Sequence, residues 1–338
     1  MEKDLEVLER EVQSLTGKLK DLKREIAKVI IGQDETVEQL IISFLAGGHI
    51  LLEGVPGLAK TLMIRTLSQA IDLKFRRIQF TPDLMPSDII GTEILEEDHS
   101  TGKKFFKFNK GPIFANIILA DEINRTPPKT QAALLEAMQE FEVTYSGQTY
   151  KLDRPFFLLA TQNPIEQSGT FPLPEAQQDR FLSYIKIGYP SEKEETDILM
   201  QTTGLKSKKV IPVLNGEDIL RLQELVREVP ISEDLVKTVS KLVRSTRPET
   251  TNNDYVKEWV NWGAGPRAGQ AMILTAKARA LVHGRLAVTM EDLKHVALPV
   301  LRHRTILNFK AEAEGISSDD VTRHLLKSIN AETNTSKR

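Results

Sequence analysis

The sequence predicts an α/β fold followed by a helical region, on three observations. Three apolar runs, HILLEG, ANIILADE and PFFLLATQNP, are short and end at glycine or polar residues, which is typical of buried parallel strands. Helical segments follow the first two runs, and this alternation favours a sheet covered by helices on both faces. After Tyr189 and Pro190 no strand is predicted and helix starts follow one another. We therefore expect an α/β domain over residues 1–190 and a smaller all-helical domain over residues 191–338.

Length and composition agree with two globular units and exclude several classes of protein. The chain has 338 residues, enough for about two domains. With 40% hydrophobic and 27% charged residues, it is neither collagen-like nor disordered. Lys and Arg total 45 against 47 for Asp and Glu, so the net charge of -2 argues against a dedicated nucleic-acid motor.

The sequence contains no cysteine, which excludes disulfides, thiolate metal sites and cysteine-based catalysis. No run approaches the roughly 18 apolar residues of a membrane span. The charged start MEKDLEVLEREV does not suit the core of a signal peptide. A cytoplasmic protein without a membrane span is therefore expected.

The first segment is predicted to be a helix with one narrow apolar face. Its apolar residues recur at intervals of three and four, at Leu5, Leu8, Val12, Leu15, Leu19, Leu22, Ile26 and Val29. The favoured interpretation is a helix docked on its own domain, because Gly17 and the small number of heptads weaken a coiled coil. Self-association through this face is the alternative.

Two insertions are predicted to be β-hairpins, and later segments to be helices or a loop. The first hairpin spans residues 91–111 with a turn at Ser100, Thr101 and Gly102, and the second spans residues 142–152 with a turn at Ser146 and Gly147. A helix is expected to open at Thr126, Pro127 and Pro128, and others at Ser191, Ser232, Thr289 and Ser318. Residues 247–266, rich in Asn, Thr and Gly, are expected to form a loop.

The segment GVPGLAKT has the composition and the context of a phosphate-binding loop. It follows an apolar strand and precedes a helix, so its backbone N–H groups can surround phosphate oxygens at a helix N-terminus. Lys60 would reach the β and γ phosphates, and the Thr61 hydroxyl would bind Mg²⁺. The residues expected to bind nucleotide here are Gly54, Val55, Pro56, Gly57, Leu58, Ala59, Lys60, Thr61 and Leu62.

A second motif, IILADE, ends a buried strand with two carboxylates. Asp121 is predicted to hold Mg²⁺ together with Thr61. Glu122 is predicted to accept a proton from the attacking water. The two motifs together predict Mg²⁺-dependent hydrolysis of ATP.

These motifs, with NR at residues 124–125, LLATQNP and LPEAQQDRF, resemble the AAA+ ATPases and specifically the MoxR family, over nearly the whole chain. The resemblance implies a P-loop AAA+ core, two hairpin inserts that face the central channel of a ring, and an all-α lid. Ala59 replaces the glycine of the general phosphate-loop pattern, but this family tends to have GVPGLAKT. IIGQDE resembles the segment that contacts adenine, which implicates Ile31, Gly32 and Gln33.

The resemblance assigns three further residues. Asn163 matches the sensor 1 position, where its amide can orient the attacking water. Arg180 matches the arginine presented to the nucleotide of a neighbouring subunit, with Arg125 and Arg154 as competing candidates. Arg267, in GPRAGQAM, matches the sensor 2 arginine that reaches nucleotide from the lid.

The first hairpin carries a mixture of basic and aromatic residues. They are Lys103, Lys104, Phe105, Phe106, Lys107, Phe108 and Lys110. Such a mixture can stack on nucleic-acid bases or grip a polypeptide, and the alternative is that the aromatic rings pack on the sheet.

The function expected from the resemblance is that of a ring-forming ATPase, expected to be a hexamer, which remodels or assembles client proteins. The family implies partners that contain a von Willebrand factor A domain. Two alternatives remain at this stage: a nucleic-acid translocase of the MCM-like group, and a slow nucleotide-binding regulatory switch.

Overall fold

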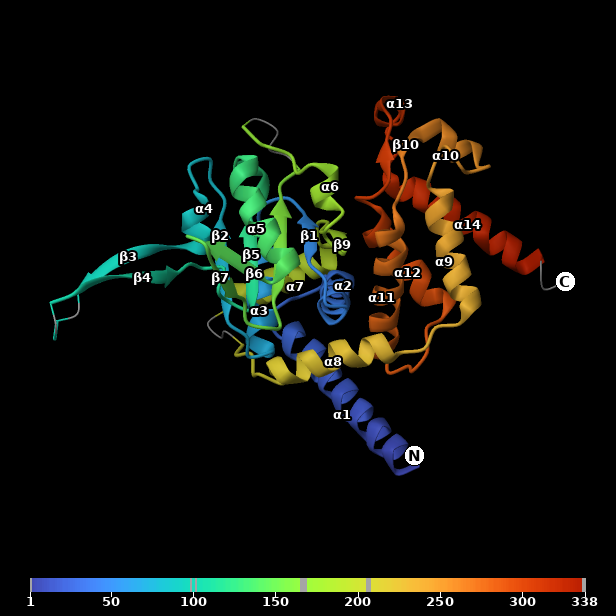
Figure 1. Ribbon diagram of the computed structural model, residues 1–338. Helices are drawn as coiled ribbons and strands as arrows, with labels where there is room; N and C mark the ends of the chain where they lie inside the picture. Colours follow the sequence, from blue (N-terminus) through green and yellow to red (C-terminus); the bar gives the residue numbers. More distant parts are fainter. Residues whose placement is uncertain (1, 98, 101, 165–168, 205–207, 336–338) are drawn as a thin grey trace.

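A five-stranded parallel sheet forms the centre of the N-terminal part of the computed structural model (Figure 1). The structure describes residues 2–335 except 98, 101, 165–168 and 205–207, with side chains from residue 11 to 329. The strand order is β2-β5-β8-β1-β9, all neighbours being parallel. The strands are β1 (Ile50–Glu53), β2 (Phe75–Gln79), β5 (Ile117–Asp121), β8 (Phe157–Gln162) and β9 (Ser183–Lys186).

The three predicted strands are the three inner strands of this sheet. Both faces of β1, β5 and β8 are covered, which explains their continuous apolar sequences. The edge strands β2 and β9 were not predicted from the sequence. Arg76 and Arg77 on β2 are exposed, and β9 ends at the exposed Lys186, so neither strand has the continuous apolar character of a central strand.

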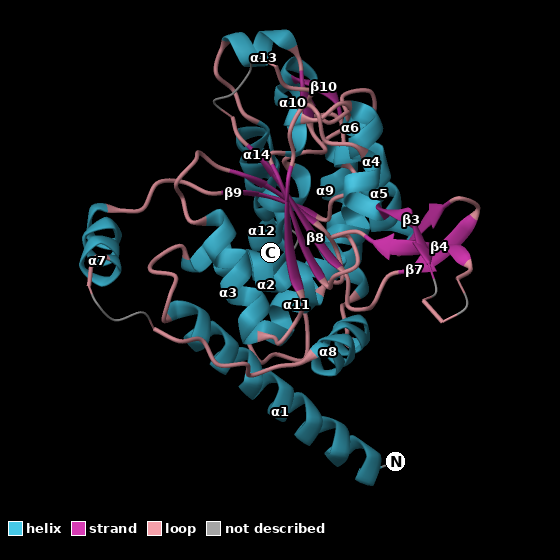
Figure 2. Cartoon of the chain, turned by 90° about the vertical axis from the view of Figure 1, so that its left-hand side faces the viewer, coloured by secondary structure: helices cyan, strands magenta, loops and turns pink. Residues whose placement is uncertain are grey.

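Alternate residues of the strands pack into two cores on opposite faces of the sheet. Helices cover both of these faces (Figure 2). One face is covered by α1 (Glu2–Ala27), α2 (Asp34–Leu45) and α3 (Lys60–Ala70). The opposite face is covered by α4 (Pro86–Ile90) and α5 (Pro128–Glu140). A short 3₁₀ helix, Ile123–Arg125, links β5 to α5, and α6 (Glu175–Gln178) precedes β9.

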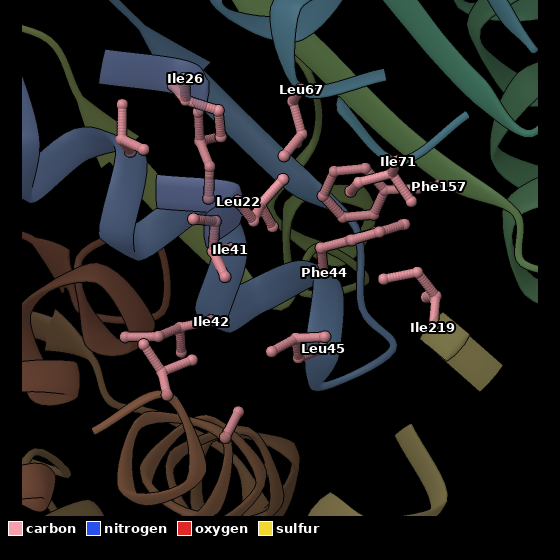
Figure 3. Packing of buried hydrophobic residues seen from close by; sticks show 14 of the residues in the cluster. Leu22, Ile26, Ile41, Ile42, Phe44, Leu45, Leu67, Ile71, Phe157 and Ile219 are labelled. Atoms are coloured by element: carbon pink, nitrogen blue, oxygen red, sulfur yellow. The ribbon is translucent and has the colours of Figure 1, made fainter. Parts of the chain in front are cut away.

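The C-terminal half of α1 packs on its own chain. Leu15, Leu19, Leu22 and Ile26 are at most 6% exposed. Figure 3 shows Leu22 and Ile26 in the same cluster as residues of α2 and β8. This burial agrees with the docked-helix interpretation over these turns. The side chains of residues 1–10, including Leu5 and Leu8, lie outside the described part.

Both predicted hairpins are present. The first pairs β3 (Gly91–Glu97) with β4 (Lys104–Lys110) and projects from the body of the molecule (Figures 1 and 2). Thr101 of its expected turn lies outside the described residues. The second pairs β6 (Glu142–Tyr145) with β7 (Gln148–Lys151), and Ser146 and Gly147 turn through positive φ values as a tight hairpin requires.

The second half is helical, as predicted. Its helices are α7 (Glu192–Thr202), α8 (Gly216–Glu228), α9 (Glu233–Ser245), α10 (Asp254–Trp259), α11 (Pro266–Val282), α12 (Met290–Leu301), α13 (Phe309–Ala313) and α14 (Ser318–Thr335). Ser191, Ser232 and Thr289 stand at the N-caps predicted for them. The hydroxyl of Ser317 accepts the N–H of Asp320, so α14 begins at Ser318 as expected, with its cap one residue earlier.

The structure adds a two-stranded antiparallel ribbon to this half, formed by β10 (Val260–Trp262) and β11 (Ile306–Leu307). The expected loop over residues 247–266 is therefore wrong for residues 254–262, which form α10 and β10. Strands of two and three residues are too short to show an alternating pattern, and Val260 alone is deeply buried in β10.

The helices after Pro190 divide between two cores. Ile219, Leu222 and Leu225 of α8 and the end of α11 join the core of α1 and α2, whereas residues of α9, α10, α11, α12 and α14 form a third core. The boundary between residues 190 and 191 stays a prediction. Among the described residues, no helix has the length and apolarity needed to cross a bilayer.

The chain just after α12 attaches this helical part to edge strand β9. The guanidinium of Arg302 donates to the carbonyl oxygen of Tyr184 at 2.6 Å, and Nε2 of His303 donates to that of Phe181 at 3.0 Å. Arg304 donates to the carbonyl oxygens of Phe181 at 2.6 Å and Leu182 at 3.1 Å. Consecutive side chains thus bind backbone acceptors in and just before β9.

Candidate active site

The predicted phosphate loop joins the end of β1 to the start of α3, and its backbone curls before the helix. Gly57 and Ala59 have φ values of 88° and 54°, in the left-handed region. Ala59 is the N-cap of α3, which explains why glycine is common at this position in the general pattern. An alanine there bears a left-handed backbone cost of about 1–2 kcal/mol.

Lys60 is folded back onto this loop. Its ammonium group donates to the carbonyl oxygens of Gly54 at 2.5 Å and Val55 at 2.9 Å. Burial lowers the pKa of Lys60, while the charges of Asp121 and Glu122 act in the opposite direction. Lys60, in the first turn of α3, lines the same cavity as both acidic residues.

Asp121 and Glu122 share one hydroxyl partner on the neighbouring strand. The Thr161 hydroxyl donates to Asp121 Oδ1 at 2.6 Å and accepts the backbone N–H of Glu122 at 2.8 Å. Glu122 has a φ of 58°, which turns the chain sharply after β5. Its Oε2 accepts from Gln79 Nε2 at 2.7 Å. These contacts hold both carboxylates at the C-terminal edge of the sheet.

Arg77, which sequence reasoning missed, contacts the same acidic pair. Its Nε and Nη2 atoms lie 2.9 and 2.7 Å from Asp121 Oδ2. The guanidinium also donates to the side-chain oxygen of Gln79, which in turn bonds Glu122. No local motif marks Arg77, because it meets Asp121 only through the pairing of β2 with β5.

One cavity of ≈ 440 Å³ brings five of the predicted site residues together. Lys60, Thr61, Asp121, Glu122 and Asn163 all line it. The remaining lining residues are Pro56, Gly57, Leu58, Ala59, Leu62, Arg77, Thr161 and Gln162. Gly54 and Val55 take part through their bonds with Lys60. The backbone N–H groups at the helix start and the ammonium group fit nucleotide phosphates. The hydroxyl and carboxylate oxygens fit Mg²⁺.

Arg180 and Arg267 line a different cavity, of ≈ 290 Å³, with Gly48, His49 and Gln270 among the other lining residues. Arg180 is exposed, and its guanidinium has no ion-pair partner among the residues that the structure describes. Arg267 Nη1 lies 3.5 Å from Asp179 Oδ2. The two arginines are therefore neighbours on one surface, outside the lining of the phosphate-loop cavity.

The competing arginines are engaged within their own chain. Arg125 Nε lies 3.2 Å from Glu122 Oε2. The guanidinium of Arg154 stacks on the Phe141 ring, with its central carbon 3.8 Å from the ring centroid. Arg154 is exposed like Arg180, so what distinguishes Arg180 is the absence of a side-chain ion pair or ring contact among the described residues.

Comparison with known proteins identifies the family. The family model described as ATPase family associated with various cellular activities (AAA) matches residues 49–183, and an AAA lid domain matches residues 253–325. The chain is 45% identical over 306 residues to Chaperone MoxR1 of Mycobacterium tuberculosis, covering 90% of this chain and 80% of that protein. The chain belongs to the MoxR family of AAA+ ATPases.

Two other relatives extend this finding. Protein MoxR of Methylorubrum extorquens is 29% identical over 301 residues, 84% of this chain and 86% of that protein. A crystal structure of a candidate ATPase from Cytophaga hutchinsonii superposes with a TM-score of 0.89 at 43% identity, covering 96% of this chain and 98% of that one. The predicted AAA+ core, helical lid and ATPase class are thereby confirmed.

The segment that the family resemblance assigns to adenine lies beside the chain that leaves β9. Gly32 and Gln33 both have positive φ values, and Gln33 Nε2 donates to the carbonyl oxygen of Gly188 at 3.0 Å. The side chain of Glu194 fills the space where a Cβ on Gly32 would lie. Ile31, Gly32 and Gln33 are not in the lining of the ≈ 440 Å³ cavity. In this MoxR-family chain their contact with adenine stays a prediction.

Proposed function

We propose that the chain hydrolyses ATP with Mg²⁺ in the ≈ 440 Å³ cavity, and that it does so within a head-to-tail ring that remodels client proteins. The observation that carries the first part is the convergence of Lys60, Thr61, Asp121, Glu122 and Asn163 on one cavity. These five side chains come from the start of α3 and from the ends of β5 and β8. Parallel strands place such groups together at their carboxyl ends, where α/β folds bind ligands.

Each residue has a proposed role. Lys60 exchanges its loop carbonyls for the β and γ phosphates, and the Thr61 hydroxyl and Asp121 hold Mg²⁺. The metal supplies charge neutralisation at the phosphates. Glu122 accepts the proton of the attacking water, and the Asn163 amide orients that water. Asn163 is 6% exposed, so its amide is held by its surroundings at the cavity wall.

The ring proposal is supported by the position of Arg180 and Arg267. Both lie on a surface outside the cavity of their own chain. An arginine at such a place is suited to act on a phosphate in the cavity of a second copy. A repeated contact of this kind is head-to-tail and closes into a ring, for which we propose a hexamer.

The client proposal is supported by the relatives and by the β3–β4 hairpin. One relative is named a chaperone. The hairpin extends from the body of the molecule, and Phe105 and Phe106 at its outer part are 46% and 71% exposed (Figure 1). Exposed aromatic rings among lysines are suited to gripping a polypeptide. We propose client proteins, including those with a von Willebrand factor A domain, as the partners.

The test of the catalytic assignment compares the wild type with Lys60→Ala and Glu122→Gln. Steady-state phosphate release should require Mg²⁺ and should fall by about 10² or more in Glu122→Gln, the usual scale for loss of a general base. A fluorescent ATP analogue should still bind Glu122→Gln and should not bind Lys60→Ala. Glu140→Gln, at the exposed end of α5, is the matched control and should hydrolyse ATP like the wild type. Unchanged turnover in Glu122→Gln would remove the proposed base.

A further inference from the structure

The carboxylate proposed to hold Mg²⁺ already has a cationic partner. Asp121 Oδ2 is contacted by both Nε and Nη2 of Arg77, at 2.9 and 2.7 Å. The other oxygen, Oδ1, accepts from the Thr161 hydroxyl at 2.6 Å. A carboxylate oxygen has about two lone-pair directions, so Arg77 takes the acceptor capacity of Oδ2.

The fold presents Arg77 to this carboxylate from the edge of the sheet. Arg77 and Gln79 lie on one face of β2, whereas Ile78 between them packs into the core on the opposite face. Strand pairing sets Arg77 opposite Leu119 and Gln79 opposite Asp121, so the long arginine side chain reaches forward along β5 to the carboxylate. Arg77 also lines the cavity itself.

Of the two side chains, Arg77 is the more exposed and so has more room to move than Asp121. The side chain of Asp121 is 11% exposed, while that of Arg77 is 46% exposed. Among the described residues, Arg77 contacts Asp121 and Gln79 through its guanidinium. Its aliphatic stem can therefore carry the charge into solvent or further into the cavity, while Thr161 keeps the carboxylate in place.

We propose that Arg77 is a positioning residue that competes with Mg²⁺ for Asp121. Without nucleotide, its guanidinium neutralises the carboxylate and keeps it aimed into the cavity. Binding of Mg²⁺ with nucleotide would require Arg77 to release Asp121, whose carboxylate would then help to hold the metal. This inference rests on the proposed function, because it assigns the metal to Asp121.

If Arg77 competes with the metal, a substitution that removes its guanidinium should lower the stability of the nucleotide-free protein but raise its affinity for the metal. Removing the guanidinium leaves the carboxylate of Asp121, beside Glu122, without its hydrogen-bonded cation, so the nucleotide-free protein should become less stable. The same removal abolishes the cost of displacing Arg77, so the metal should bind more tightly. A purely structural role for Arg77 predicts weaker metal binding together with the lower stability.

The experiment measures Mn²⁺ binding by electron paramagnetic resonance in the presence of saturating ADP. Arg77→Gln should bind Mn²⁺ about fivefold more tightly than the wild type, the scale of a partly exposed ion pair. Its melting temperature without nucleotide should fall by about 2 °C. Arg76→Gln is the matched control, since it removes the same charge from the adjacent exposed position of β2 and should leave the Mn²⁺ affinity within about twofold of the wild type.

A second variant and a second measurement separate the possible failures. Arg77→Lys keeps the charge but lacks the paired donors of a guanidinium. Its Mn²⁺ affinity should therefore lie between that of the wild type and that of Arg77→Gln. Binding of a fluorescent ATP analogue in EDTA tests nucleotide binding without metal. A wild type that binds neither the analogue nor Mn²⁺ would overturn the proposed function. A wild type that binds both, with equal or weaker Mn²⁺ affinity in Arg77→Gln, would overturn the competition alone.

Discussion

His49 precedes β1, and burial keeps its ring neutral. The residue is 5% exposed, its Nε2 donates to the carbonyl oxygen of Met138 at 2.9 Å, and its Nδ1 accepts the N–H of Leu158 at 3.0 Å. Burial lowers the pKa of His49 to about 4, from an ordinary value of 6.5. The ring thereby joins α5 to β8, and protonation would break the bond to Leu158.

The low pKa of His49 predicts a loss of stability in mild acid. Because the folded pKa is below the unfolded one, the unfolded chain binds more protons between pH 6.5 and 4, and the free energy of unfolding falls as the pH falls through this window. A pKa that drops from 6.5 to about 4 corresponds to about 3 kcal/mol, fully present above pH 6.5. Urea unfolding at pH 7, 6 and 5 measures the decline. Burial lowers the pKa of His303 as well, and this adds to the decline in the same direction.

The control for this prediction is another histidine. His49→Gln should show a smaller decline in unfolding free energy between pH 7 and 5, whereas His99→Gln, at an exposed position on the first hairpin, should keep the wild-type decline. If His49→Gln loses stability with pH as steeply as the wild type, His49 is not the group responsible.

Residues of the site differ in how far sequence alone could identify them. Lys60, Thr61, Asp121 and Glu122 belong to short motifs next to apolar runs, so their clustering follows from the geometry of parallel strands. Arg77 and Thr161 are single residues within strands. Their contacts depend on which strands pair and in which register, and neither is visible in a local pattern.

Among the elements, the two hairpins are tied together by aromatic rings at their bases. Phe108 stacks on Tyr150 with ring centroids 4.3 Å apart and contacts Phe114 edge-on at 5.9 Å. Phe105 and Phe106, which lie nearer the turn of the hairpin than Phe108, are exposed. The hairpin thus has a packed base and an exposed outer part, and both alternatives weighed for its aromatic rings apply, each to different residues.

This division predicts different results for substitutions along β4. Replacing Phe105 and Phe106 together by Ala should leave basal ATPase activity and the melting temperature unchanged, and should weaken capture of a client protein. Phe108→Ala is the matched comparison and should lower the melting temperature by several degrees, because it removes about 1–3 kcal/mol of packing. A comparable loss of stability in the Phe105/Phe106 variant would identify those rings as structural instead.

Element prediction succeeded where burial or capping chemistry is continuous. The inner strands, the two hairpins and the N-caps at Ser191, Ser232 and Thr289 were predicted. The edge strands β2 and β9 and the ribbon of β10 and β11 were not, because β2, β9 and β10 mix polar and apolar residues and β11 has only two residues. Their place in the fold depends on tertiary pairing rather than on local pattern.

At the scale of the whole molecule, the surface that carries Arg180 and Arg267 is held by hydrogen bonds between the α/β part and the helical part. Arg304, 6% exposed, bonds the Asp179 carboxylate at 2.8 Å and the carbonyl oxygens of residues 179, 181 and 182. Asp179 in turn lies 3.5 Å from Arg267. The helical part therefore holds the segment that carries Arg180, and the two arginines should move together.

A mixing experiment can test whether Arg180 acts on the nucleotide of its own chain or on that of a neighbouring chain. Arg180→Ala and Glu122→Gln should each be nearly inactive alone. In an equal mixture, a complete site forms where the cavity of one variant meets the arginine surface of the other, so about a quarter of wild-type ATPase activity should return. No recovery would mean that Arg180 acts on its own chain's nucleotide.

The same design separates the two possible roles of Arg267. If Arg180 and Arg267 both serve a neighbour's cavity, a mixture of Arg180→Ala with Arg267→Ala should stay inactive, since every neighbour lacks one of the two. Recovery to about a quarter would instead assign Arg267 to the nucleotide of its own chain.

Arg302, His303 and Arg304 bind the backbone in and just before β9, and this has a consequence for a chain that is still being synthesised or that is truncated. An uncovered edge strand presents unpaired carbonyl and N–H groups to which another chain can add a strand. Here the acceptors at Phe181, Leu182 and Tyr184 are occupied by side chains that are made more than a hundred residues later. A fragment that ends near Pro190 would leave these groups unpaired, so we expect it to aggregate more readily than the full chain.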